Sequence, residues 1–378
     1  MIAKDDIVIR KAILHILDTT HGECILSNTI LDPGPDLHDF IRNHIYKIVS
    51  SDDTKNCEFD PEYSPIYSIL ETWDESDETS FIETSQAIAN KLYIAMGEGL
   101  DIPAADLLFV TFQAEGTIYL ALLKMNYKDS YTHEVTIDSS YELHKTVDAE
   151  DNIIPASASD EDVANTMDNI TDTTSDTPVI NTGIIKTHSL LPSATSRIPE
   201  AVIINLSDYH IKLLEKRYEI NGEKAFYLSE NFLVCRTSIP PKKKLNILTR
   251  VINNISNKYD GADLKTKMDT KSALQKEYVD RQSFDVEEIG NKLFGKSPEK
   301  KSEFDEKMEQ YDLQYDNFTV TNESTVKKLE KQVMVTDSGI EISIPMETYN
   351  KLANFEVQTD VTGKSTIIIR NIDNLILK

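Results

Sequence analysis

Clusters of positively charged side chains are the residues best suited to chemistry, and the chemistry that they suit is the binding of anions. Lys242, Lys243 and Lys244 begin a predicted helix, and Arg250 lies two turns further on. Lysines at the positive end of a helix are mildly unfavourable, so an anionic partner would compensate for them. Amide side chains on the same helix can contact phosphates or base edges. They are Asn246, Asn253, Asn254 and Asn257.

Two smaller basic clusters lie elsewhere in the chain. Lys212, Lys216 and Arg217 are on a predicted strand, and Arg10-Lys11 lies near the N-terminus. Taken by itself, each cluster is more typical of an ordinary solvated surface than of a binding site. Taken alone, the motifs therefore indicate a soluble α+β protein without catalytic activity.

The tripeptide Gly363-Lys364-Ser365 matches the end of a phosphate-binding loop. Such a loop needs a glycine five residues earlier and a helix immediately afterwards. Gln358 occupies the earlier position, and the β-branched residues 366–369 that follow are typical of a strand. We therefore expect Gly363 to form the turn of a β-hairpin.

Other local signatures of catalysis or cofactor binding are incomplete. Gly97-Glu98-Gly99 has Ile102 where a dinucleotide loop would have its third glycine. The eight histidines include no His-x3-His pair, and the three cysteines form no Cys-x2-Cys motif. We expect no catalytic residues, no metal and no cofactor.

The overall charge is strongly acidic, with a formal value of −25. At physiological salt, charges are screened beyond about 8 Å, so a local basic surface can still bind phosphate. The N-terminus has no signal-peptide pattern, and the apolar runs are shorter than the roughly 20 residues of a membrane span. We expect a cytoplasmic protein in a reducing compartment.

Residues 147–183 form an acidic segment with nine Asp or Glu and with no aromatic residue, Lys or Arg. Such a composition buries too little apolar surface to offset its ordering entropy, so we expect a flexible linker or insertion. An acidic tail that mimics DNA is the alternative. The segment predicts an N-terminal domain at 1–146 and a C-terminal domain at 184–378 that ends in a β-hairpin.

Blocks of helices and antiparallel strands predict the α+β class, because βαβ alternation is absent. Asn221-Gly222 is the strongest short hairpin signal. Apolar residues of the helix that begins near Lys242 recur every three to four positions, which predicts one buried face. Other helices are predicted at 37–48, 80–96, 263–281, 283–294 and 298–311. Strands are predicted at 7–17, 24–31, 106–112, 117–127, 201–206, 210–220, 339–345, 355–359 and 365–370.

Long stretches of the chain resemble the bacterial nucleoid-associated proteins of about 37 kDa. They include FIETSQAIANKLYIAM, DIPAADLLFVTFQAEGTIYLALLKMNYKDSY, IPEAVIINLSDYHIKLLEKRYEINGEKAFYLSENFLVCR and FEVQTDVTGKSTIIIRNI. The likeness covers residues 7–130 and 186–378. It implies a cytoplasmic, nucleoid-associated protein that binds double-stranded DNA or acts on a DNA-processing partner. We predict DNA binding with little sequence preference, and a homodimer would double the phosphate contacts.

Two other functions stay open. An acidic protein-interaction module would act on a basic DNA-processing partner, with little affinity for DNA. A metal-dependent nuclease would need carboxylates and a lysine that converge in one concave site, which the sequence alone does not reveal.

Overall fold

The computed structural model of the chain describes residues 2–137, 180–261, 264–350, 355–360, 364–372 and 374. Contacts within the chain divide it into two compact units. The first comprises Met1–Asn126 together with Pro192–Lys378, and the second comprises Tyr127–Leu191. The second unit is thus inserted within the first. Helices and antiparallel strands occur together, which confirms the α+β prediction.

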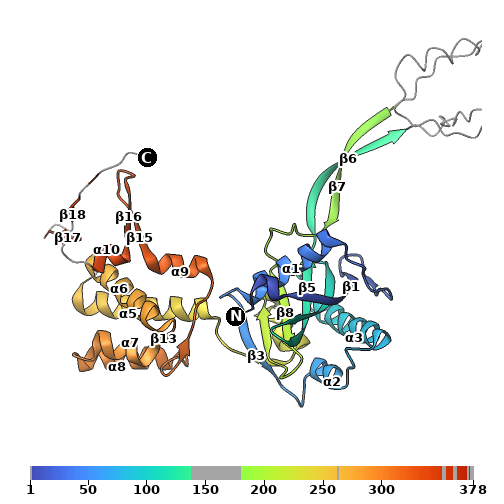
Figure 1. Ribbon diagram of the computed structural model, residues 1–378, viewed down its shortest axis with the longest axis horizontal. Helices are drawn as coiled ribbons and strands as arrows, with labels where there is room; N and C mark the ends of the chain where they lie inside the picture. Colours follow the sequence, from blue (N-terminus) through green and yellow to red (C-terminus); the bar gives the residue numbers. More distant parts are fainter. Residues whose placement is uncertain are drawn as a thin grey trace, which may run out of the picture. The chain divides into compact units, whose positions relative to one another are not determined.

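An antiparallel sheet of eight strands, in the order β12-β3-β9-β8-β5-β4-β1-β2, organises the N-terminal part of the first unit (Figure 1). Its central hairpin turns through Glu115 and Gly116, whose φ angles of 49° and 79° suit a two-residue turn. The strands are β1 (Val8–Asp18), β2 (Glu23–Ile25), β3 (Lys55–Phe59), β4 (Ala105–Ala114), β5 (Thr117–Asn126), β8 (Glu200–Asn205), β9 (Ile211–Leu214) and β12 (Cys235–Thr237).

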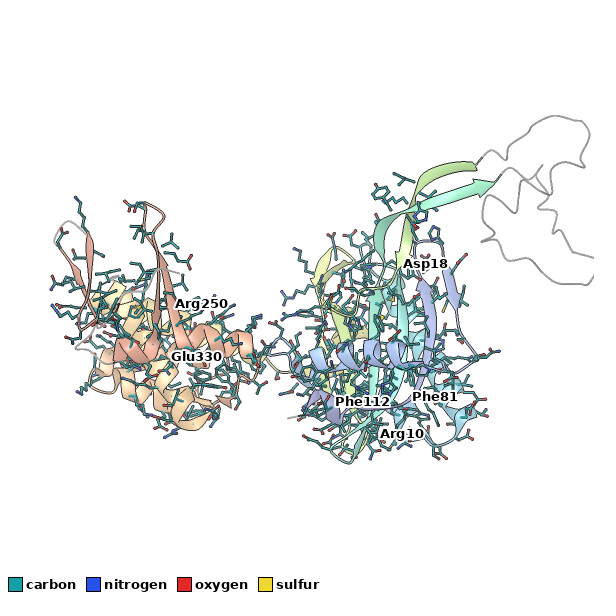
Figure 2. The ribbon with its side chains drawn as sticks, turned by 45° about the horizontal axis from the view of Figure 1, so that its top comes forward. Arg10, Asp18, Phe81, Phe112, Arg250 and Glu330 are labelled. Atoms are coloured by element: carbon teal, nitrogen blue, oxygen red, sulfur yellow. The ribbon has the colours of Figure 1, made fainter. Side chains whose placement is uncertain are left out.

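Helices cover both faces of this sheet, so the N-terminal part has three layers (Figure 1). α1 (Pro35–Val49) packs against one face, and α3 (Glu78–Gly97) packs against the other with α2 (Pro65–Glu71). Phe112 belongs to the core beneath α1, whereas Phe81 belongs to the opposite core (Figure 2).

The two-sided cover explains why β4 is almost continuously apolar. Successive residues of a strand point to opposite faces. Leu108 and Val110 therefore join the core beneath α1, while Leu107 and Phe109 join the core beneath α3. A strand buried on both faces needs no polar alternation.

The predicted domain boundary at 184 does not coincide with the end of the N-terminal sheet. β5 pairs with β8 from Tyr119↔Asn205 to Lys124↔Glu200. β9 and β12, which also follow the acidic segment, continue the sheet through β3. Residues 200–237 therefore complete the N-terminal sheet. A change in composition reveals an insertion, whereas strand pairing depends on residues distant in sequence.

Helices dominate the remainder of the first unit. The predicted buried face of α5 is confirmed, since Leu248, Ile252 and Ile255 lie in a core with Phe284 and Phe304. The short strand pair β13 (Phe284–Asp285) and β14 (Asn317–Phe318) closes this core. The helices are α5 (Pro241–Asp260), α6 (Leu264–Arg281), α7 (Val286–Phe294), α8 (Pro298–Glu309) and α9 (Glu323–Glu330).

Several short hairpins complete the unit. Asn221 and Gly222 both have positive φ between β10 (Tyr218–Ile220) and β11 (Glu223–Ala225), as predicted. Near the C-terminus, β15 (Lys331–Val335) pairs with β16 (Glu341–Pro345), α10 (Met346–Asn350) follows, and β17 (Phe355–Thr359) pairs with β18 (Ser365–Ile369).

The structure bears directly on the phosphate-loop motif. Ser365 begins strand β18, whereas a phosphate-binding loop would continue into a helix there. The predicted turn residue Gly363 lies outside the described residues, but β17 and β18 form the antiparallel pair expected on either side of it. The flanking residues support a hairpin.

The second unit contains a two-stranded ribbon of β6 (Lys128–Ile137) and β7 (Ile180–Leu190), which pair in antiparallel register. The predicted linker at 147–183 therefore overlaps β7 by four residues. The rest of that predicted segment lies outside the described residues.

Candidate nucleic-acid interface

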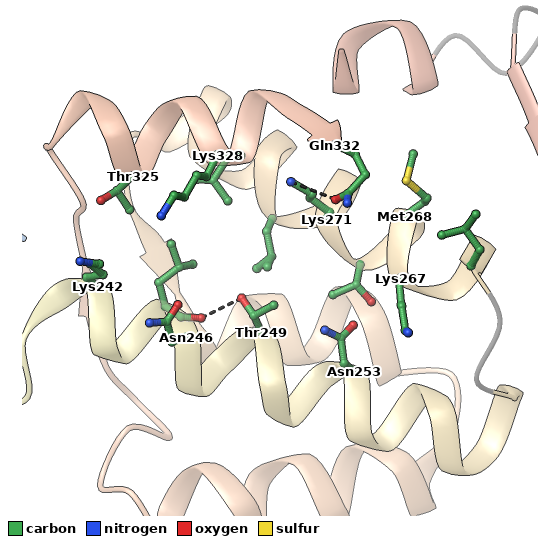
Figure 3. A pocket seen from close by; sticks show the side chains of 15 residues that line it. Lys242, Asn246, Thr249, Asn253, Lys267, Met268, Lys271, Thr325, Lys328 and Gln332 are labelled. Carbon is green, nitrogen blue, oxygen red and sulfur yellow. Dashed lines mark hydrogen bonds between the residues drawn. The ribbon is translucent and has the colours of Figure 1, made fainter. Parts of the chain in front are cut away.

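A groove between α5, α6 and α9 has a basic lining and a volume of about 360 Å³ (Figure 3). Fifteen residues line it, and four of them are lysines, while none is Asp or Glu. We call it the lysine groove. Its lining residues are Lys242, Leu245, Asn246, Thr249, Asn253, Leu264, Lys267, Met268, Thr270, Lys271, Leu274, Thr325, Lys328, Leu329 and Gln332.

Helical periodicity brings the polar residues of α5 to the groove. Lys242, Asn246, Thr249 and Asn253 are spaced by three or four positions, so they share one face of the helix. Figure 3 shows Asn246 directed from α5 towards the space below α9. The apolar stripe of the same helix packs into the helical core, which fixes the polar face in place.

The four lysines of the groove differ in their partners. Lys271 Nζ donates hydrogen bonds to the Lys331 carbonyl oxygen at 2.8 Å and to Gln332 Oε1 at 3.0 Å, and burial lowers its pKa. Lys267 and Lys328 are exposed and form no ion pair with any described residue. These two cations are available to bind an anion from solution.

An acidic loop touches the edge of the groove. Lys242 Nζ lies 2.7 Å from a carboxylate oxygen of Asp53. The adjacent Asp52 is buried and accepts hydrogen bonds from the backbone N–H groups of Thr321 (2.8 Å) and Asn322 (3.1 Å). The loop is thereby held to the residues that precede α9.

The other predicted residues of α5 lie outside the groove lining. Lys243 is exposed. Lys244 forms an ion pair of 2.7 Å with Asp316. Arg250 donates a hydrogen bond of 3.0 Å to the Tyr311 hydroxyl. Only one of the four predicted cations of this helix, Lys242, therefore lines the groove.

The predicted cluster at 212–217 is also divided. Lys212 Nζ donates to the Val49 carbonyl oxygen at 3.2 Å, and burial lowers its pKa. Lys216 is exposed, and the exposed Arg217 lies over the Phe226 ring, 4.6 Å from its centroid. Lys212 is therefore partly buried and hydrogen-bonded within the fold, while Lys216 and Arg217 face solvent.

The N-terminal pair is engaged locally. Arg10 forms an ion pair of 3.0 Å with Glu75, and Lys11 Nζ donates to the carbonyl oxygens of Glu75 (2.8 Å) and Ser76 (2.9 Å). Arg10 belongs to the sheet part and Arg250 to the helical part (Figure 2). The nine predicted residues thus do not form one continuous basic surface.

Sequence reasoning did not select Lys267, Lys271 or Lys328. A usable signal was present, since Lys267 and Lys271 are four residues apart and share a face of α6. That face lines a groove only because α6 packs beside α5 and α9, and the sequence did not show this packing. Asn246 and Asn253 were identified as potential contacts, and both line the groove.

The described part of the chain contains neither a cluster of metal-binding side chains nor a membrane-spanning helix. No group of three or more His, Cys, Asp or Glu side chains is placed there to hold a metal ion. None of the helices that are described has the length and apolar character needed to cross a lipid bilayer.

Similarity to a known protein family extends over most of the chain. A model of the NA37 family, described as nucleoid-associated protein YejK, matches residues 13–376. The chain belongs to this family. The match includes the eight-stranded sheet, apart from the start of β1, and the helices of the lysine groove. No curated protein matches the chain significantly. Membership of the family supports a nucleoid-associated role.

Proposed function

We propose that the chain binds double-stranded DNA, with little sequence preference, through the lysine groove. The observation that carries the proposal is a lining with four lysines and no carboxylate in a chain of net charge −25. Acidic residues that lie more than about 8 Å from this surface are largely screened from it at physiological salt. The groove can therefore attract phosphates that the molecule as a whole repels at long range.

The types of side chain account for the lack of sequence preference. Lysine presents a point charge on a flexible stem, and contacts to phosphates position a protein on DNA without reading its bases. Lys267 and Lys328 would neutralise phosphates, while Asn246 and Asn253 would donate hydrogen bonds to phosphate or sugar oxygens. A bidentate arginine, which reads guanine most often, is absent from the lining.

The salt dependence of DNA binding tests this proposal. We expect the Lys267→Gln/Lys328→Gln double variant to bind duplex DNA more weakly. The slope of log K against log salt should become shallower by about 1.8, because each phosphate contact contributes about 0.9. Lys327→Gln is the matched control, since Lys327 is adjacent on α9 but pairs with Glu323 at 2.8 Å. A slope unchanged in the double variant would overturn the lysine groove as the DNA site.

Two separate experiments test the remaining parts of the proposal. We propose binding without cleavage, so supercoiled plasmid with Mg²⁺ should remain intact, and nicking would contradict this. We also propose a homodimer, because two copies would neutralise twice as many phosphates. Sedimentation of the free protein checks the dimer independently of DNA.

A second candidate is docking of a basic DNA-processing protein. The observation that favours it is the local neutralisation of predicted cations, such as Arg10 by Glu75 and Lys244 by Asp316. In that case the purified chain would bind duplex DNA weakly, and the lysine-groove variants would not change its salt slope. Deletion of 147–179 would strengthen DNA binding under the first proposal and weaken capture of the partner under the second.

A further inference from the structure

A second cavity with cationic side chains lies on the sheet part of the chain, apart from the lysine groove. It has a volume of about 330 Å³ and is bounded by the second half of α1, the segment before β8 and the end of β9. We call it the His44 pocket. Its lining residues are His44, Lys47, Ile48, Ser51, Asp53, Arg197, Ile198, Pro199, Leu214, Glu215 and Lys216.

His44 is the unusual residue of this pocket. Its side chain has no exposed surface, yet neither ring nitrogen has a hydrogen-bond partner. Most buried polar groups in proteins are paired, so an orphan of this kind calls for an explanation, which is either an ordered water molecule or a ligand. Burial and then the charge of Lys47 lower the pKa of His44 to about 4. The neutral ring therefore offers one donor and one acceptor at neutral pH.

The charges in the lining favour an anion. Lys47, Arg197 and Lys216 form no ion pair with any described residue. Lys47 Nζ instead donates to the carbonyl oxygens of Ala194 (2.7 Å) and Ser196 (3.2 Å). Burial, followed by the positive charges of Arg197 and Lys4, lowers the pKa of Lys47. A bound anion would relieve this mutual repulsion.

The two carboxylates of the lining are already neutralised by other residues. Asp53 pairs with Lys242 at 2.7 Å. Glu215 pairs with Lys55 at 2.6 Å and also accepts hydrogen bonds from the backbone and hydroxyl of Ser229. Neither lysine lines the pocket. The three cations of the lining therefore lack counter-charges of their own.

We propose that the His44 pocket binds a small phosphate monoester with an apolar or planar body. Three cations suit a dianion better than a monoanion, and Ile48, Ile198 and Leu214 supply apolar walls for the body of the ligand. The volume suits a molecule of nucleotide size, and ligand sites commonly combine an apolar lining with a few convergent polar groups. This goes beyond the proposed binding of DNA and uses a different cavity.

Adenosine 5′-monophosphate is the probe, with adenosine and inorganic phosphate as its two halves, and calorimetry measures binding to the full chain. We expect the monophosphate to bind, and each half to bind at least tenfold more weakly. Arg197→Gln/Lys216→Gln should reduce binding of the monophosphate at least tenfold. Lys224→Gln/Arg236→Gln removes two exposed cations outside the pocket and should leave binding unchanged.

His44→Phe separates a ligand-binding role from a structural one. Phenylalanine keeps the ring that packs against Phe40, 4.6 Å away between centroids, but removes both nitrogens. We expect weaker binding of the monophosphate with no loss of thermal stability. Binding that survives both His44→Phe and Arg197→Gln/Lys216→Gln would overturn the proposal, as would inorganic phosphate binding as tightly as the monophosphate.

The two cavities can be tested independently of each other. Lys267→Gln/Lys328→Gln should weaken DNA binding and leave monophosphate binding intact, whereas the pocket variants should do the reverse. If Arg197→Gln/Lys216→Gln weakened DNA binding in a chain that binds none of the three probes, the pocket would belong to the DNA surface, and the small-ligand proposal would be wrong.

Discussion

The Lys242 ammonium lies 2.7 Å from the Asp53 carboxylate, so an acidic loop partly neutralises the edge of the lysine groove. Both side chains are more than a third exposed, and water screens the pair. Asp53→Asn should therefore release Lys242 towards phosphate and tighten duplex DNA binding by about two- to fivefold, in line with the energies of exposed ion pairs. Fluorescence anisotropy at low salt measures the change.

Asp316→Asn is the control for this prediction. It frees Lys244, which does not line the groove, and removes the same charge. If both variants tighten binding equally, net charge alone sets the affinity, and Lys242 has no special role.

A buried ion pair joins the neighbouring strands β5 and β8. Lys124 Nζ lies 3.0 Å from Glu200 and 2.6 Å from Asn126 Oδ1, and the Tyr218 hydroxyl donates to Glu200 at 2.9 Å. Glu200→Gln would leave the Lys124 charge buried without a counter-ion. We expect a loss of about 3–5 kcal/mol in the free energy of unfolding, measured by chemical denaturation.

Removal of both charges tests the origin of that loss. Lys124→Met/Glu200→Gln keeps an acceptor for Tyr218 but leaves no buried charge. The double variant should therefore be more stable than Glu200→Gln alone. Equal losses in the two variants would show that hydrogen bonding, and not the unpaired charge, accounts for the effect.

Gly290 of α7 lies against the Phe304 ring. A Cβ atom at this position would be 2.5 Å from Cε1 of Phe304, which is too close for any packed side chain. Alanine favours helices over glycine by about 1 kcal/mol, but overpacking of a core costs about 1–3 kcal/mol. We expect Gly290→Ala to lower the free energy of unfolding, whereas Gly97→Ala, with open space around it in α3, should not. Stability of Gly290→Ala at or above that of the wild type would mean that the Phe304 ring moves freely.

His15 should make the fold sensitive to acid. Its Nε2 lies 3.0 Å from the Ser85 hydroxyl, and its Nδ1 accepts a hydrogen bond of 3.1 Å from the Ser27 backbone N–H, which fixes the neutral tautomer. Burial lowers the pKa of His15 to about 4 from its unfolded value of 6.5. The unfolded chain binds the proton more readily, so this contribution is complete above pH 6.5 and declines as the pH falls towards 4.

The expected loss from His15 between pH 7.5 and pH 5 is about 2 kcal/mol. His15→Asn keeps a polar group near Ser27 but cannot take up a proton. It should lower stability at pH 7.5 and flatten the pH dependence below 6.5. Denaturant titrations at both pH values measure this, and an unchanged pH slope would contradict the assignment.

Short sequence patterns correctly predicted the elements that depend only on neighbouring residues. Asn221-Gly222 formed its turn because both residues accept positive φ, and the spacing of Leu248, Ile252 and Ile255 placed one face of α5 in the core. The pairing of β8 with β5 could not be predicted in this way. Its partners are separated by about eighty residues, and their apolar character suits any central strand.

The candidate site likewise combines features that depend on neighbouring residues with features that depend on tertiary packing. Arg10 resembled a free surface cation in the sequence, but the fold brings Glu75 to within 3.0 Å of it. Lys267 and Lys328 are distant from each other in the sequence. They line the same groove because the two helices that carry them, α6 and α9, pack together. Charge type is local information, whereas the neutralisation or convergence of charges is decided by tertiary contacts.

The chain leaves the sheet after β5 and returns to pair with that same strand as β8. The anchoring ends are thus held by the sheet ladder, whatever polypeptide lies between them. Each doubling of an intervening loop costs only about 0.6 kcal/mol, so its length is nearly free to vary. The segment between β5 and β8 is therefore a suitable insertion site. A fluorescent reporter or an affinity module could be inserted there while the pairing of β5 with β8 is retained.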